Sequence, residues 1–317
     1  MVNQPKMAEA KVLATGLRFP EGPVWLADGR VALVEIARGT VSVVEPDGRV
    51  RVLATPGGGP NGLAVGPDGA FYVCNNGGFD WHEQDGRLRP GLQPAEYSGG
   101  RIERVDAVSG AVTRLYEACG GHPLRGPNDL VFDRHGGFYF TDLGKTRARE
   151  RDQGGVYYAL ADGSRIVELA YPLITPNGIG LSPDGGTVYV AETATARLWA
   201  FDLEQPGVAR MRPLPSPHGG RLVAGLGGYQ MFDSLKVDAA GNICVATLVT
   251  GAVTVISPAG EVLRVVRFAD PSTTNICFGG PGQRTAYVTL SSTGQLVAMD
   301  WMADGWAVPG LALNHAI

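Results

Sequence analysis

The sequence predicts an all-β fold, a six-bladed β-propeller with a central metal site. The first observation is a unit that recurs six times, most weakly in its last copy. It has an opening with a polar residue, a short apolar strand and a tight turn into a second strand. The second observation is the turn, because Asp-Gly and Gly-Gly between alternating apolar runs are strong hairpin signals. A further strand pair follows each hairpin, which makes about four strands per unit, the pattern of a propeller blade.

A polar side chain occupies the same opening position in every copy. In a propeller the first strand of each blade lines the central channel, so we expect these six side chains to point at the axis, at one end of the channel. They are called the opening residues below: Glu21, Asn61, Asn128, Asn177, Asp233 and Thr274.

The ends of the chain follow from the same architecture. Residues 1–10 are expected to form a flexible N-terminal tail, and residues 11–317 a single propeller domain. Residues 11–15 read as a short strand, and residues 295–300 as its partner in the last blade. Such a pairing of the two terminal strands closes the ring and removes an open sheet edge.

A long insertion, residues 76–100, interrupts the second copy. Connections of this length inside a compact domain are usually functional lids or disordered linkers. The aromatic residues Phe79, Trp81 and Tyr97 favour a packed loop, either a lid over the channel or a surface loop with structural aromatics. If it is a lid, Trp81 contacts the substrate.

Composition limits the partners. The net charge of −4 and the lack of long basic runs argue against nucleic acid. No apolar run approaches the ~20 residues of a membrane span, and the first residues lack the apolar core of a signal peptide. The four cysteines form no CxxC pair and read as free thiols, so a cytoplasmic protein acting on a small molecule is expected. The oligomeric state stays open.

The opening residues predict the metal site. Glu21, Asn128, Asn177 and Asp233 form an all-oxygen set, which suits one hard divalent cation. Ca²⁺ fits this irregular set best, Mg²⁺ and Mn²⁺ stay open, and Zn²⁺ is less natural without His or Cys. A single Asn-Gly would read as an ordinary turn. Recurrence at one repeat position, and a glutamate there, favour the metal site.

Several of these motifs together resemble the gluconolactonase, or regucalcin (senescence marker protein), family, over about residues 12 to 300. They are Phe19-Pro20-Glu21-Gly22-Pro23-Val24-Trp25, Pro127-Asn128-Asp129, Phe140-Thr141-Asp142, Pro176-Asn177-Gly178 and Thr274-Asn275-Ile276-Cys277-Phe278-Gly279-Gly280. The resemblance implies a six-bladed propeller that holds one divalent cation and hydrolyses lactones, mainly sugar lactones.

The resemblance also implies roles for single residues. Glu21, Asn177 and Asp233 correspond to metal ligands, and Asn128 to a residue at the metal or its substrate. Arg125 corresponds to a substrate-binding arginine, although Gly126-Pro127 alters the spacing. Asn61 is expected to contact the substrate.

The expected reaction is metal-dependent hydrolysis. The cation would polarise the lactone carbonyl, and Asp233, beside Glu21, would activate water or relay a proton to the leaving oxygen. No GxSxG motif is present, which disfavours a serine hydrolase. Two alternatives stay open: a phosphotriesterase-like hydrolase resembling diisopropyl fluorophosphatase, and a non-catalytic propeller that binds calcium or a protein.

Overall fold

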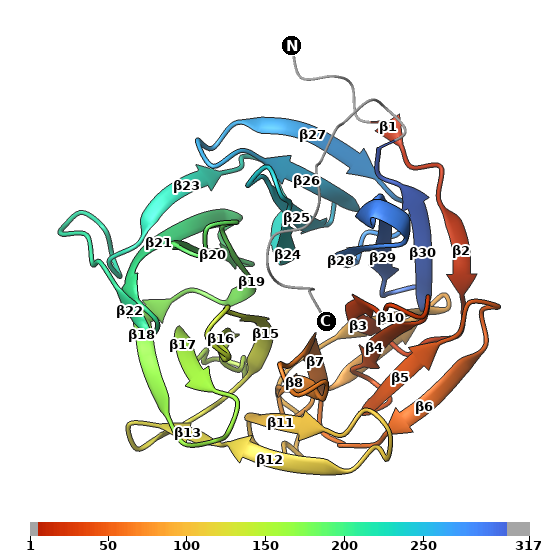
Figure 1. Cartoon of the computed structure of the whole chain (residues 1–317), viewed down its shortest axis with the longest axis horizontal. Coiled ribbons are helices and arrows are strands. Elements are labelled where there is room, and N and C mark those ends of the chain that lie inside the picture. The colour runs from red at the N-terminus through yellow and green to blue at the C-terminus, as the bar shows by residue number, and fades with distance from the viewer. Residues whose placement is uncertain (1–5, 303–317) are drawn as a thin grey trace.

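A computed structural model describes residues 6–302 of the chain, and the last fifteen positions of the expected domain lie outside the described residues. Six sheets, antiparallel except for one short edge strand, stand around a central axis as the blades of a propeller, which confirms the predicted fold (Figure 1). The innermost strands contact one another in ring order: β3 (Pro20–Trp25), β7 (Pro60–Val65), β15 (Pro127–Phe132), β19 (Pro176–Leu181), β24 (Met231–Val237) and β28 (Thr273–Gly279).

Each blade continues outward from its inner strand by antiparallel pairing. Blades 1 to 3 add β4 (Val31–Glu35), β5 (Thr40–Val44) and β6 (Val50–Ala54); β8 (Phe71–Asn75), β11 (Arg101–Val105) and β12 (Val112–Tyr116); and β16 (Gly137–Asp142), β17 (Gly154–Leu160) and β18 (Ile166–Leu173). Blades 4 and 5 add β20 (Thr187–Glu192), β21 (Arg197–Gln205), β22 (Val208–Ala209) and β23 (Arg221–Gly225); and β25 (Ile243–Leu248), β26 (Ala252–Ile256) and β27 (Val262–Arg267).

The last blade is closed by the start of the chain. Its strands β28, β29 (Thr285–Leu290) and β30 (Gln295–Asp300) are completed by β2 (Lys11–Ala14), which pairs antiparallel with β30. The predicted pairing of the two terminal strands is therefore confirmed. Within the expected tail, β1 (Lys6–Met7) pairs in parallel with the outer strand β27 of blade 5. A short 3₁₀ helix, η1 (Pro281–Gln283), precedes β29.

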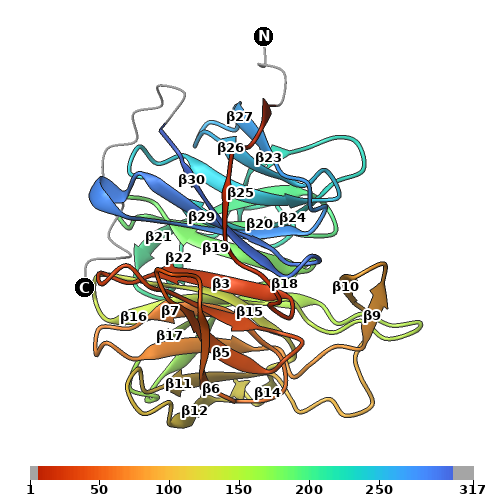
Figure 2. The same cartoon turned by 90° about the vertical axis from the view of Figure 1, so that its right-hand side faces the viewer.

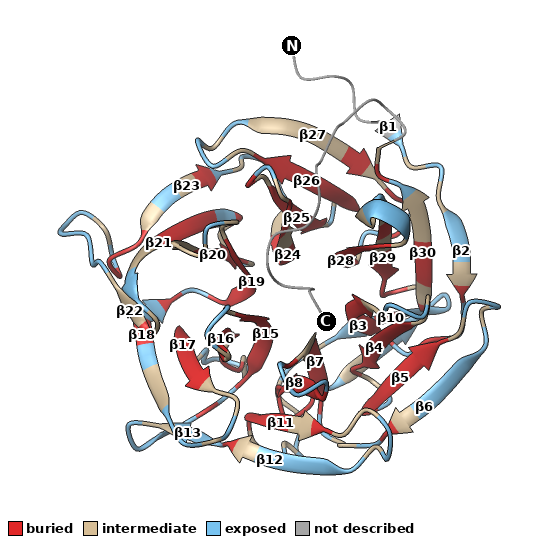
Figure 3. Ribbon diagram, viewed as in Figure 1, coloured by how far each residue is buried: buried red, intermediate tan, exposed pale blue. Residues whose placement is uncertain are grey.

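Burial falls from the inner strands outward. Figure 3 shows β3, β15, β19 and β28 almost wholly buried, and the outer strands β6, β12 and β18 largely exposed or intermediate. The apolar residues gather in clusters between neighbouring blades; one, for example, joins Tyr139 and Tyr158 of blade 3 to Val190 and Phe201 of blade 4. Such clusters hold the ring together by burying apolar surface.

Every inner strand has a register irregularity at its opening residue or, in blade 1, directly after it. The pairing to the second strand shifts between Pro60 and Gly62, between Pro127 and Leu130, and between Phe232 and Leu235, and equivalent shifts occur in the other three blades. A bulge leaves a residue out of the ladder and turns its side chain to a new direction. In five blades the opening residue therefore lies within the bulge, and in blade 1 Glu21 lies directly before it.

The glycine after the opening residue is needed for packing. A Cβ at Gly62 would lie 2.4 Å from the carbonyl oxygen of Asn128, and one at Gly178 would lie 2.6 Å from that of Asp233. Both glycines lie within strands, so these Asn-Gly pairs are not turns. Instead, the inner strands of adjacent blades approach so closely that no side chain fits between them.

The insertion in blade 2 carries its own hairpin, β9 (Trp81–Gln84) and β10 (Arg87–Pro90), which stands out from the body of the propeller in Figure 2. Trp81 packs on Phe19 at a ring-centroid distance of 5.2 Å. Leu88 is buried, and its N–H donates to the carbonyl of Ser292 in blade 6 at 2.9 Å. The hairpin is thus held against blades 1 and 6.

The base of the insertion is held by a buried lysine from blade 3. The Lys145 ammonium donates to Oδ1 of Asn76 at 3.1 Å and to the carbonyl of Gly78 at 2.6 Å. It also lies 3.8 Å from the centre of the Phe79 ring, a cation–π contact. Burial lowers the pKa of Lys145 to about 7, against the opposing charges of Asp142 and Asp152.

One further short strand pair completes the fold. Strands β13 (Ala118–Cys119) and β14 (His122–Pro123) form a small hairpin before β15. The four cysteines are free thiols, as expected. None of the described helices is long and apolar enough to cross a membrane.

Candidate active site

The opening residues come from six different blades and are all buried, in spite of their polarity. They lie where the six inner strands begin and meet at one end of the channel. Buried polar side chains are stable only when they are hydrogen-bonded or bind a charged group. Their partners therefore indicate what this end of the channel can do.

Glu21 is held through one of its two carboxylate oxygens. Its Oε2 accepts hydrogen bonds from the N–H of Gly22 and from Nδ2 of Asn275, each at 2.8 Å. Burial raises the pKa of Glu21 to about 7, although the hydrogen bonds from Asn275 and Gly22 favour the charged form. The orientation of this carboxylate is therefore set by blade 6 as well as by its own strand.

Asp233 lies close enough to Glu21 for the two charges to interact. Burial raises the pKa of Asp233 well above its ordinary range, and the charge of Glu21 raises it further. Asn177 opposes the shift by donating to the carboxylate, and the hydroxyl of Ser234 lies 3.5 Å from Oδ1 of Asn177. Two buried carboxylates that repel each other are the electrostatic signature of a cation site.

A third carboxylate, Asp129, lies near the first two. Burial raises its pKa, and its charge raises the pKa of Glu21 and of Asp233. The ammonium of Lys236, on the inner strand of blade 5, lies 3.8 Å from Oδ2 of Asp129. Lys236 therefore compensates part of the negative charge gathered in the channel.

The donors present fit a hard divalent cation. Oδ1 of Asn128 is buried and has no hydrogen-bond partner, which is costly for an amide oxygen. A cation bound beside Glu21 and Asp233 would satisfy it. Among residues 6–302 there is no group of three or more His, Cys, Asp or Glu arranged to hold a metal. Amide oxygens are a further class of ligand, and the expected set is two carboxylates with two amides.

The remaining predicted residues lie on β7, on β28, on the loop before β15 and on the insertion. Asn61 is buried on β7, and Thr274 is hydrogen-bonded to Thr289 and Ser291 within blade 6. Arg125 is exposed on the loop that leads to Asn128, and its backbone N–H, not its side chain, bonds to Asp142. Trp81 lies on the insertion, against Phe19.

A polar residue at the end of the second strand anchors the loop before the opening residue in four blades. Glu35 accepts from the N–H of Arg18 at 2.8 Å, Glu192 from that of Ile174 at 2.7 Å, and Asn75 from that of Gly59 at 2.9 Å. The corresponding residue of blade 3, Asp142, accepts from the N–H groups of Arg125 and Gly126 at 2.7 Å and of Gly144 at 2.9 Å.

Blade 5 lacks this anchor. The corresponding residue, which pairs with Phe232, is Thr247, and its hydroxyl bonds within blade 5 to Val245 and Thr254. Within the described chain no side chain accepts a hydrogen bond from the backbone of residues 226–230. The loop that leads to Asp233 is therefore held differently from the loops that lead to the other candidate ligands.

Sequence reasoning missed the residues that follow the opening position. In blades 1, 2 and 4 this position holds glycine, whereas blades 3, 5 and 6 have Asp129, Ser234 and Asn275. The signal was available: the same alignment of repeats, read one residue further, shows a second position with polar side chains. The anchors are equally visible as a polar residue at the end of each second strand in blades 1 to 4.

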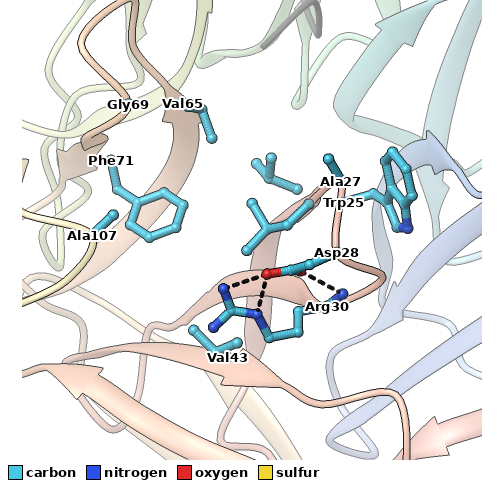
Figure 4. Close-up of a pocket in the computed structure, with 11 residues that line it drawn as sticks. Trp25, Ala27, Asp28, Arg30, Val43, Val65, Gly69, Phe71 and Ala107 are labelled. Atoms are coloured by element: carbon cyan, nitrogen blue, oxygen red, sulfur yellow. Dashed lines mark hydrogen bonds and ion pairs between the residues drawn. The ribbon is translucent and has the colours of Figure 1, made fainter.

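Two cavities, of about 230 Å³ and about 240 Å³, lie away from the opening residues. The first lies between blades 1 and 2, past the far end of β3, and contains the ion pair of Asp28 and Arg30 beside Trp25 and Phe71 (Figure 4). The second occupies the equivalent place between blades 3 and 4. Because they recur at hairpin turns between neighbouring blades, these grooves are features of the architecture.

Known proteins of the same shape include hydrolases and a calcium-binding protein. The structure superposes on a gluconolactonase of Xanthomonas campestris with a TM-score of 0.71 at 24% identity, covering 92% of this chain and 90% of that one. It superposes on a calcium-binding protein, regucalcin, of Agrobacterium tumefaciens with a TM-score of 0.73 at 22% identity, covering 98% of both chains. These likenesses show the fold.

Sequence relatives extend the comparison. A gluconolactonase of Zymomonas mobilis is 27% identical over 307 residues, which is 89% of this chain and 78% of that protein. The lactonase drp35 of Staphylococcus saprophyticus is 30% identical over 249 residues, 77% of this chain and 69% of that protein. The model of the SMP-30/gluconolactonase/LRE-like region matches residues 19–292, so the chain belongs to this family.

Proposed function

We propose that this protein is a divalent-cation-dependent hydrolase that opens a lactone, a sugar lactone or a related cyclic ester. One observation carries the proposal: two buried carboxylates, Glu21 and Asp233, interact with each other, and Asn128, at the same repeat position of blade 3, has a buried amide oxygen without a hydrogen-bond partner. The names of the relatives, gluconolactonase and lactonase, support the same reaction.

Each residue has a defined task in this proposal. Glu21, Asn128, Asn177 and Asp233 would hold the cation, and Ca²⁺ fits this set of ligands best. When bound, the cation supplies Lewis-acid polarisation of the lactone carbonyl. Glu21, with Oε2 held by Asn275 and Gly22, keeps a fixed orientation.

Asp233 handles the proton. The water oxygen bonds to the carbonyl carbon, the ring C–O bond breaks, and Asp233 passes a proton from the water to the leaving ring oxygen. The product is a hydroxy acid. Lys236 and Asp129 limit the surplus negative charge around this step. Asn61, Arg125 and Trp81 contact the substrate around the reacting carbon.

A substrate panel tests the proposal. The purified protein is assayed with δ-lactones, linear esters and phosphotriesters, after EDTA treatment and after addition of Ca²⁺, Mg²⁺, Mn²⁺ or Zn²⁺. Hydrolysis of lactones that EDTA abolishes and a cation restores supports it. Turnover of phosphotriesters alone would favour the phosphotriesterase-like alternative. Cation binding without turnover of any compound would favour a non-catalytic propeller.

A further inference from the structure

Three large apolar side chains are exposed on the loops of blades 4 and 5 at the mouth of the channel. Ile174 is 43% exposed, Tyr229 80% and Val249 37%. Single exposed apolar residues are ordinary on a protein surface. These three are of interest because of where they stand.

Hydrogen bonds join their loops into one arc, called the apolar rim below. The N–H of Thr193 donates to the carbonyl of Thr175 at 3.0 Å, which joins the loop of Ile174 to the loop after β20. The N–H of Leu226 donates to the carbonyl of Ala196 at 3.1 Å, which joins that loop to the one that carries Tyr229. Met231 pairs with Leu248, the residue before Val249.

The apolar rim borders two of the proposed metal ligands. Ile174 precedes Asn177 by three residues, and Tyr229 precedes Asp233 by four, each just before the inner strand begins. A group bound at the reacting centre would therefore extend over these side chains on the side of blades 4 and 5.

The loops of blades 4 and 5 differ in charge from the loops on the opposite side of the mouth. Residues 171–177, 193–196, 226–232 and 247–252 contain no Asp, Glu, Lys, Arg or His. The corresponding loops of blades 1 and 3 carry Arg18, Arg38, Arg125 and Arg147. Contact with the apolar rim would leave the hydroxyls of a sugar facing apolar groups, whereas an alkyl or aryl group would gain from burial there.

We infer that the substrate carries an apolar group, alkyl or aryl, on the ring that is opened, and that the apolar rim with Tyr229 at its centre binds this group. The inference rests on the proposed function and names its substrate class. Tyr229 acts on specificity, so it should affect the preference between substrates more than the chemical step.

The experiment compares δ-lactones that share one ring and differ in their alkyl tail, from none to six carbons, together with glucono-δ-lactone. For the unaltered protein, kcat/KM is expected to rise with tail length, by up to about fourfold per methylene. In Tyr229→Ala the ratio of kcat/KM for the six-carbon lactone to kcat/KM for the unsubstituted lactone should be at least tenfold smaller, with kcat for the unsubstituted lactone unchanged. Leu214→Ala is the matched control, because Leu214 is 89% exposed on a loop outside the apolar rim.

Two outcomes would overturn the inference while lactone opening stands: kcat/KM that does not depend on tail length, or an equal response of Tyr229→Ala and Leu214→Ala. If the unaltered protein is found to be a dimer, and Tyr229→Ala is a monomer that keeps the tail preference, the inference is likewise overturned and this face contacts a second copy of the chain. If no lactone is opened, binding is measured with δ-lactams with and without a hexyl tail. Tighter binding of the hexyl lactam that Tyr229→Ala removes supports the apolar rim, and equal binding of the two lactams overturns it.

Discussion

Blades 3 and 5 each supply a candidate ligand, Asn128 and Asp233, but they hold the preceding loop in opposite ways. In blade 3 the buried carboxylate of Asp142 accepts three backbone N–H groups. In blade 5 the corresponding residue, Thr247, bonds within its own blade instead of to the loop, and the loop before Asp233 presents Tyr229 to solvent. One loop is fixed by charge-assisted hydrogen bonds, and the other is left uncharged and open.

The difference matches the tasks proposed for the two residues. A ligand such as Asn128 needs one orientation, and the two hydrogen bonds from Arg125 and Gly126, in the segment before it, support that orientation. The loop beside Asp233 faces the substrate, and an apolar, weakly anchored segment can adapt to a variable group. The same strand pairing thus serves both a rigid and an adaptable side of one site.

The largest expected effect is on catalysis in blade 5. Asp233→Asn keeps an oxygen ligand but removes the proton acceptor, so kcat at saturating cation should fall by about 10²–10⁴-fold. Glu21→Gln also loses a charge, yet excess cation should restore most of its kcat. Steady-state kinetics across a cation titration distinguish the two variants, once both are shown to fold. Equal rescue would reduce Asp233 to a ligand without a role in proton transfer.

The second effect is on stability in blade 3. Asp142→Leu leaves three N–H groups without their acceptor, so the free energy of unfolding should fall by about 3 kcal/mol. Urea denaturation measures this loss. Asp142→Asn, which keeps one acceptor oxygen, should lose about half as much. If the two variants lose the same amount, the hydrogen bonds to the loop do not account for the role of Asp142.

The third effect is a pH dependence of the free energy of unfolding, caused by Glu21, whose charge interacts with Asp233 of blade 5. The pKa of Glu21 is raised from 4.5 to about 7 in the folded protein, so the folded state binds more protons than the unfolded state between these values. The stabilisation that protonated Glu21 contributes to the folded state is complete below pH 4.5 and is lost as the pH rises through about 7. Without metal, the free energy of unfolding should therefore decrease by about 2.5 kcal/mol between pH 5 and pH 8.

Unfolding in EDTA at both pH values measures this change. Glu21→Gln should lack most of it, and a saturating cation should restore stability at pH 8. A metal-free protein that is equally stable at both pH values, and equally stable with the cation, would contradict a cation site at these carboxylates.

The smallest effect concerns the side of the mouth opposite the apolar rim. Trp81→Ala should change KM several-fold, since Trp81 packs on Phe19, two residues from Glu21. The melting temperature should fall by only a few degrees, because Leu88 and Lys145 still hold the insertion. Trp81→Phe keeps an aromatic contact and should behave almost as the unaltered protein. Unchanged kinetics with a large loss of stability would make Trp81 a packing residue.

The sequence alone determined the propeller, its six blades and their closure by residues 11–15. These follow from local chemistry, because alternating apolar residues and Asp-Gly turns specify hairpins wherever they stand in the fold. The set of opening residues, from Glu21 to Thr274, also follows from the repeat. Residues at the same position of the repeat take equivalent places in all six blades.

Only the tertiary structure decided what surrounds these residues. The hydrogen bond from Asn275 to Glu21 spans 254 residues, and Lys145 reaches the insertion 67 and 69 positions away. The glycine after Asn61 is required by the backbone of another blade, and Lys236 faces Asp129 across two different strands. Periodicity describes a strand and its turn. Contacts between blades depend on how closely six strands pack around one axis, which no local pattern records.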